Sequence, residues 1–170
     1  MSLIATTTST IDPAWIAGAG WLALRLSVAW LFLWPLPGLL KDWSTTVATT
    51  SLVFPLPTLT TCFGLLVMPL GAISVALGVY GRIGAALLAA YCIGGAFVHM
   101  ALARQSQSLI NELTIPQDQH ATAQKAADIG AVGNITSAWK NWTVAGSCIF
   151  MALVGTGQWS LLNLFAEQTP

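Results

Sequence analysis

Four stretches of the chain are apolar over lengths that match the thickness of a lipid bilayer. They cover residues 14–40, 60–80, 83–103 and 139–165. A helix needs about 20 apolar residues to cross a hydrocarbon core about 30 Å thick, and inside that core only helices and closed barrels satisfy their backbone hydrogen bonds. The pattern therefore predicts an all-α, polytopic membrane protein, a four-transmembrane-helix bundle. We expect one longer extramembrane loop, residues 104–138, between the third and fourth spans, and a single membrane domain over residues 1–170.

Composition supports this assignment and limits the partners. Hydrophobic residues make up 55% of the chain and charged residues only 7%, whereas about a quarter of a soluble domain is charged. The formal net charge is zero, which argues against the basic face that a nucleic-acid-binding protein needs. We therefore expect membrane lipid and other membrane subunits as partners, and no nucleic acid.

The first span contains two prolines near its end. Pro35 and Pro37 follow directly after Trp34 and Leu36, and a proline inside a helix removes a hydrogen bond and clashes with the preceding turn. The pattern predicts that the helix kinks or ends near Trp34. We expect the chain to continue from there as an irregular or interfacial segment.

The second and third spans are separated by only a few residues around Gly81. So short a connection predicts two adjacent, antiparallel helices. Small residues then recur at four-residue spacing in the third span, at Ala86, Ala90 and Gly94. Because small side chains let helices approach closely in lipid, we expect this ladder to be a helix contact face, within the bundle or with another subunit.

Residues 104–138 are the one sizeable polar stretch between spans. Within it, Pro116 suits the first turn of a helix and Gly130 suits a cap after the last turn, which predicts a short helix between them. The stretch lies on the same side of the predicted bundle as the connection after the first span. The two connections form either a lid over that side or plain solvated linkers.

The cysteines and histidines show no metal-binding pattern. Cys62, Cys92 and Cys148 lie one on each of three spans, without a C-x-x-C pair or a histidine at ligand spacing. We expect them to pack as small hydrophobic side chains and expect no metal site. Since His120 falls in the predicted loop, a haem held by two histidines is not expected either.

Arg25 is the most costly residue in the predicted spans. It lies about 16 Å into the first span, near mid-membrane, where a charge costs at least ~2.5–3.5 kcal/mol and needs a partner. No Asp or Glu occurs in any span. Arg25 is therefore either a structural residue that donates to backbone carbonyls, or a functional one that meets an anionic ligand, a quinone-type carbonyl or a partner's acid. Trp21 lies four residues earlier, on the same helix face, and is placed to stack on the guanidinium.

His99 is the one histidine within a predicted span, near the loop-side end of the third. Tyr91 lies two turns earlier on roughly the same face. A histidine near the membrane surface suits a quinone carbonyl or proton transfer. It is equally typical of an interfacial residue bonded to a backbone carbonyl.

Three pieces of the chain, in order, resemble the DoxX/DoxD family of four-helix membrane proteins. The first is ALRLSVAWLFLWPLPGLLKDW, residues 23–43, with Arg25 and a Gly-x-x-Lys exit. The second is GAISVALGVYGRIGAALLAA, residues 71–90, and the third is GTGQWSL, residues 155–161. Two acids that are frequent in the family, early in the second span and after the closing Ser-Leu, are absent here, and the segment between spans three and four is longer than in the shortest members.

The resemblance implies a function and a site. DoxD-type members form the membrane subunit of thiosulfate:quinone oxidoreductase, so we expect a quinone-linked redox subunit in a bacterial or archaeal plasma or internal membrane, with quinone as its cofactor. In that case Arg25 and His99 lie near the quinone head, and Trp21 and Trp30 line its pocket. The alternative is a non-catalytic accessory subunit that packs on a larger respiratory or photosynthetic complex. Whether the chain belongs to an enzyme stays open at this point.

Overall fold

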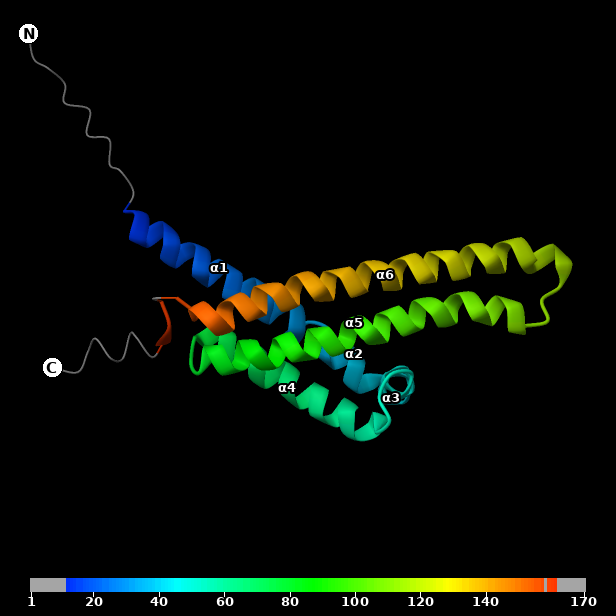
Figure 1. The fold of residues 1–170 in the computed structure, drawn as a ribbon, viewed down its shortest axis with the longest axis horizontal. Coiled ribbons are helices and arrows are strands. Elements are labelled where there is room, and N and C mark those ends of the chain that lie inside the picture. The colour runs from blue at the N-terminus through cyan, green and yellow to red at the C-terminus, as the bar shows by residue number, and fades with distance from the viewer. Residues whose placement is uncertain (1–11, 158, 162–170) are drawn as a thin grey trace, which may run out of the picture.

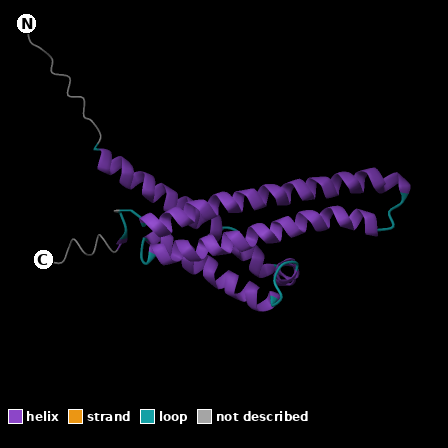
Figure 2. Ribbon diagram, in the orientation of Figure 1, coloured by secondary structure: helices purple, strands orange, loops and turns teal. Residues whose placement is uncertain are grey.

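The computed structural model describes residues 12–157 and 159–161, and over these residues it is helical without strands (Figures 1 and 2). The all-α prediction is confirmed. The helices in chain order are α1 (Pro13–Leu33), α2 (Leu36–Lys41), α3 (Trp43–Ser51), α4 (Pro57–Leu77), α5 (Gly81–Glu112) and α6 (Gln117–Val154).

The first helix ends where the prolines predict. α1 begins with Pro13 in its first turn, capped by the Asp12 carboxylate, which accepts a hydrogen bond from the Ala14 backbone N–H at 2.9 Å. It closes at Trp34, and the chain then turns at Pro35. The following segment is not irregular as expected, because it forms the short helices α2 and α3.

The second and third spans form the predicted antiparallel hairpin, α4 and α5. Gly78 ends α4 in the left-handed region, with φ of 73°, which a glycine adopts without strain. The two helices then cross closely, since a Cβ atom at Gly71 would lie 3.1 Å from the carbonyl oxygen of Gly84. Away from the turn they diverge, and α4 leads back toward α3 (Figure 1).

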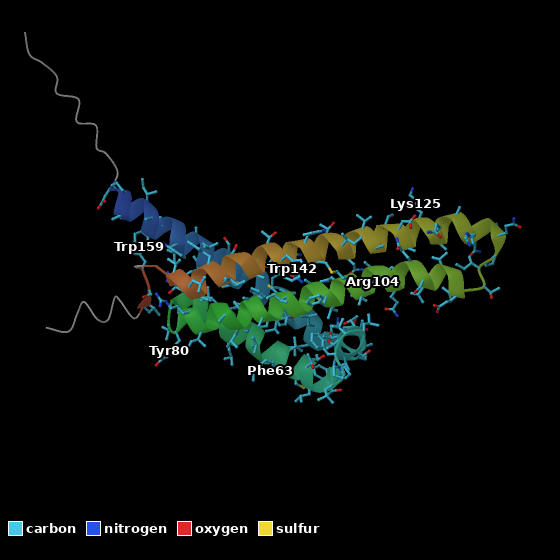
Figure 3. All side chains as sticks on the ribbon, in the orientation of Figure 1. Phe63, Tyr80, Arg104, Lys125, Trp142 and Trp159 are labelled. Atoms are coloured by element: carbon cyan, nitrogen blue, oxygen red, sulfur yellow. The ribbon has the colours of Figure 1, made fainter. Side chains whose placement is uncertain are left out.

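The prediction of a loop over residues 104–138 is wrong, because most of these residues are helical. α5 continues to Glu112 and α6 begins at Gln117, directly after Pro116, so that only residues 113–116 connect them. The helix start after Pro116 is confirmed, but Gly130 does not end the helix. Small and apolar side chains buried between α5 and α6 explain why both helices continue: Ala103, Ile110, Ala131 and Ala138. Arg104 and Lys125 lie on this distal part of the hairpin, far from Trp159 and Tyr80 (Figure 3).

Three helical segments, rather than four, are long and apolar enough to cross a membrane among the described residues. They are Pro13–Lys41, Pro57–Leu77 and Gly81–Ile110. The expected fourth span, 139–165, begins inside α6 and extends past its end at Val154, and residues 162–165 lie outside the described part. Lys140 and Asn141 interrupt its apolar run, and from there to Val154 the helix covers only about 21 Å. That length falls short of a hydrocarbon core.

The core lies where α1, α4, α5 and α6 meet. It contains Val28, Phe32, Met68, Ala72, Val75, Leu88, Cys92, Cys148 and Met151. Cys92 and Cys148 pack there as expected, whereas Cys62 is exposed. The small-residue ladder does not join this core: Ala86 and Ala90 are exposed and Gly94 is half-buried. The ladder is therefore not a contact face between the described helices, and a contact with another subunit stays a prediction.

The close crossing of α4 and α5 makes a direct prediction about stability. A Cβ atom at Gly84 would lie 2.6 Å from the Ser74 Oγ and 2.9 Å from the Gly71 carbonyl oxygen. Because the backbone cannot move aside as a side chain can, Gly84→Ala should destabilise the protein by about 1–3 kcal/mol. Gly146→Ala is the matched control, since nothing lies within 4 Å of its Cβ, and it should be neutral or stabilising. Thermal unfolding in detergent separates the two, and equal melting temperatures would contradict the packing described.

Candidate functional site

A cavity of about 520 Å³ lies where α4 diverges from α5 beneath α2 and α3. It is the candidate functional site and is called the α3 cavity below. Its lining includes Phe32, Leu39, Thr46, Thr50, Phe54, Thr61, Gly64, Met68, Ala90, Tyr91, Gly94, Gly95, His99, Lys140 and Asn141. At 1.5 Å per residue, its α5 lining lies roughly 14–32 Å from the α4–α5 turn. The cavity therefore occupies the end of the bundle away from that turn.

Small residues on α4 and α5 provide the space. Ala90, Gly94 and Gly95 face the cavity from α5. Two of the three ladder residues, Ala90 and Gly94, therefore border open space where a helix contact was expected. Gly64 on α4 lies close to Tyr91, whose ring would be 3.2 Å from a Cβ at that position. The Tyr91 ring packs edge-on against Phe32, with centroids 5.9 Å apart. Aromatic and small side chains thus shape an apolar interior.

Threonine hydroxyls face the cavity from the α3 side. The Thr61 hydroxyl donates to the Thr50 Oγ1 at 3.0 Å, and Thr50 donates to the Thr46 carbonyl oxygen at 2.8 Å. The Thr46 hydroxyl in turn reaches the carbonyl oxygens of Leu39 and Asp42. These bonds tie α3 to α2 and α4, and they let a polar helix cover an apolar space without unpaired hydroxyl donors.

His99 provides a polar group at the other end of the cavity. Its Nδ1 lies 3.0 Å from the Oδ1 of Asn134 on α6, and the Asn134 Nδ2 donates to the Gly130 carbonyl oxygen, also at 3.0 Å. Lys140 and Asn141 of α6 also line the cavity, and the Asn141 amide lies beside Gly95, one turn before His99. No Asp or Glu is among the lining residues, so the polar part of the lining favours a neutral or anionic polar head.

Arg25 lies elsewhere. It is only 1% exposed, and one of its guanidinium nitrogens, Nη2, donates to the carbonyl oxygen of Trp159. Its Nη1 lies 2.7 Å from the point where a Cβ at Gly78 would be. Arg25 is therefore beside the α4–α5 turn, whereas His99 lies about 27 Å further along α5. The two residues do not share a site, contrary to the expected arrangement.

Neither tryptophan of the expected pocket lines the cavity. The Trp21 ring stacks on Phe150 of α6, with centroids 5.5 Å apart and planes 3° from parallel, so its flat contact is not with Arg25. Trp30 is 64% exposed and contacts Trp34. Of the four residues expected at the quinone site, the structure places only His99 on the cavity.

The arginine end is closed by the segment after α6. Gly155 and Gly157 have φ of 106° and 84° and turn the chain back over the α4–α5 turn. Thr156 packs so closely on Gly81 that a Cβ there would lie 2.3 Å from the threonine methyl group. Arg82 donates to the Val154 carbonyl oxygen at 3.2 Å, at the end of α6. The three sequence pieces that carry the family resemblance thus meet at this end of the bundle.

Two guanidinium atoms of Arg25, Nε and Nη1, are buried without a hydrogen-bond partner among the described residues. The structural interpretation of Arg25 is favoured by its burial and by its hydrogen bond to a backbone carbonyl. Among the described residues, no cluster of His, Cys, Asp and Glu is placed to hold a metal ion.

Comparison of the chain with models of known protein families, with curated proteins and with solved structures gives no match.

Arg25→Leu tests what the arginine stabilises. The substitution removes a charged hydrogen bond worth about 1.5–3 kcal/mol and also relieves the burial of two unpaired nitrogens, which costs a similar amount. We expect the melting temperature in detergent to change little. The segment after α6 should loosen, however, so a cysteine at Thr156, now 9% exposed, should react faster with a maleimide.

The labelling is read in a Cys62→Ser background, because Cys62 is exposed. Arg25→Lys should restore protection only in part, since an ammonium lacks the planar fork of a guanidinium. Unchanged labelling at position 156 would contradict the assignment of Arg25 as the residue that holds this segment in place.

Proposed function

We propose that the protein is a membrane-embedded subunit of the DoxX/DoxD type that binds a quinone in the α3 cavity and serves a quinone-linked redox complex. The observation that carries the proposal is the cavity itself, an apolar space of about 520 Å³ with His99 at its polar end. Ligand pockets of this chemistry and of about 300–1,000 Å³ hold small molecules the size of a quinone head with part of its tail.

The lining suits both parts of such a molecule. A quinone head is a flat ring with carbonyl oxygens that accept hydrogen bonds, and Lys140 and Asn141 offer donors from the α6 side of the cavity. Phe32, Tyr91 and the small residues of α5 provide apolar surface for the ring and the tail. Quinone reduction takes two electrons and two protons. In this proposal the electrons come from a partner subunit that holds the donor, as in thiosulfate:quinone oxidoreductase.

A fourth membrane crossing by the second half of α6 is part of the proposal. Thr156 lies against Gly81, so the end of α6 returns to the end of the bundle where the α4–α5 turn lies (Figure 1). If α5 crosses the bilayer, the half of α6 packed beside it crosses as well. Asn141, one of the two residues that keep its apolar run short, is half-buried and lies against Gly95 of α5.

The topology is tested by labelling single cysteines in membranes. Cysteines at Tyr80, which is 72% exposed, and at Val154, which is 54% exposed, should react from one side of the membrane. A cysteine at Gln117, the first residue of α6, should react from the other side. Labelling of positions 80 and 117 from the same side would contradict the crossing of α5, and labelling of position 154 from the same side as 117 would contradict the fourth crossing.

The alternative function is a non-catalytic accessory subunit of a larger membrane complex. The exposed face of α5 around Ala86, beside Ile83 and Leu87, supports it, because small residues on a lipid-facing helix favour contact with another helix. The two functions differ in what the ladder does: Ala90 faces the cavity, and Ala86 does not line it.

A matched pair of substitutions separates the two functions. Ala90→Leu adds the same bulk as Ala86→Leu, one turn apart on the same helix, but only the first fills the cavity. We expect Ala90→Leu to weaken binding of decyl-benzoquinone at least about tenfold, since a ligand cannot share the filled space, and Ala86→Leu to leave it within about twofold. Quenching of tryptophan fluorescence in detergent measures the binding.

Thermal unfolding of both variants controls for loss of the fold. If Ala90→Leu and the unaltered protein bind the quinone equally tightly, the α3 cavity is not the binding site. Absence of quinone binding altogether, together with loss of complex assembly in Ala86→Leu, would favour the accessory subunit.

A further inference from the structure

The contact between His99 and Asn134 determines which hydrogen-bonding group faces the α3 cavity. His99 lies on α5 and Asn134 on α6, and their side chains meet between the two helices through Nδ1 and Oδ1, 3.0 Å apart. His99 is half-buried and also lines the cavity. Asn134 is not among the residues that line the cavity, so the ring nitrogen that meets it points away from that space. We infer that the other nitrogen, Nε2, lies on the cavity side of the ring.

The orientation of the Asn134 amide follows from its second contact. The Gly130 carbonyl oxygen, an acceptor only, lies 3.0 Å from the Asn134 Nδ2. Rotating the amide by half a turn would place two acceptor oxygens at that distance, which is repulsive. The amide nitrogen therefore faces Gly130, and the amide oxygen faces His99.

An acceptor opposite Nδ1 decides the tautomer of the neutral imidazole. Because the Asn134 Oδ1 can only accept, the His99 Nδ1 must carry the proton and donate it, and Nε2 is then the unprotonated nitrogen. Nε2 has no hydrogen-bond partner among the described residues and is not among their fully buried unpaired atoms. Neutral His99 therefore presents an acceptor, not a donor, to the cavity.

We propose that the α3 cavity selects the hydroxyl-bearing, reduced form of its ligand, a quinol, over the quinone. This inference rests on the proposed function and specifies which redox form the site prefers. A quinol hydroxyl donates to the His99 Nε2, while its oxygen accepts from Lys140 or Asn141, which also line the cavity. A quinone oxygen placed there faces the Nε2 lone pair, so two acceptors meet.

The ionisable and charged groups on the cavity define the conditions of the test. They are Tyr91, Cys92 and His99 from α5 and Lys140 from α6, and none of the lining residues of α1 to α4 titrates. No lining acid stabilises an imidazolium. The quinol preference belongs to the neutral imidazole, so both affinities are compared in one mildly alkaline buffer.

The test measures the affinities of decyl-benzoquinone and decyl-benzoquinol for the whole chain in detergent, without oxygen. At about pH 8 the unaltered protein should bind the quinol about tenfold more tightly. Asn134→Leu removes the acceptor that determines the tautomer, so its ratio should fall to within about threefold. Thermal unfolding of Asn134→Leu controls for loss of the fold.

Two measurements test the quinol preference separately from the proposed quinone site. Equal affinities in the unaltered protein, or tighter quinone binding, would overturn it and leave the proposed quinone site in place. The nitrogen NMR signals of ¹⁵N-labelled His99 provide a readout that needs no ligand, and a proton on Nε2 at pH 8 would overturn the inference as well. If neither redox form binds, the proposed function fails first and this inference fails with it.

Discussion

Close backbone contact at the α4–α5 turn is the constraint on which the rest of the structure depends. Gly78 and Gly81 leave no room for a side chain, and Arg25, Thr156 and the segment after α6 fill the space around them. The middle of α1, the start of α5 and the ends of α4 and α6 are held together there. α5 and α6 stay packed away from this point, whereas α4 diverges from α5, and α3 covers the space between them that forms the α3 cavity (Figure 1).

Helix ends and turns that depend only on neighbouring residues could be predicted from the sequence. The end of α1 at Trp34 follows from Pro35, and the hairpin of α4 and α5 follows from the few residues between two apolar runs. The hydropathy pattern does not predict the distal hairpin, because polar residues such as those of 104–138 are equally typical of a loop. Its helices are stabilised by a buried seam of small residues such as Ala103 and Ala131, and such a seam is too narrow to appear in a hydropathy pattern.

The candidate site was predictable only in part, for a geometric reason. His99 and Tyr91 share a helix face, and the cavity includes both. Arg25 and Trp21 also lie on one face of one helix, but which end of the bundle that face meets depends on how far α1 slides along α4, and no local pattern encodes this. Asn134 lies 35 residues after His99, in a stretch expected to be a loop, so its role emerged only from the pairing of α5 with α6.

The distance along the chain between Arg25 and its acceptor has a consequence for biosynthesis. The guanidinium and the Trp159 carbonyl are separated by 134 residues, and a chain is made at about 5–20 residues per second from its N-terminus. α1 thus emerges from the ribosome several seconds before its acceptor exists. Throughout that interval the arginine must be accommodated by water, lipid headgroups or the insertion machinery. Assembly of this end of the bundle is accordingly a late event, completed only when the segment after α6 has been synthesised.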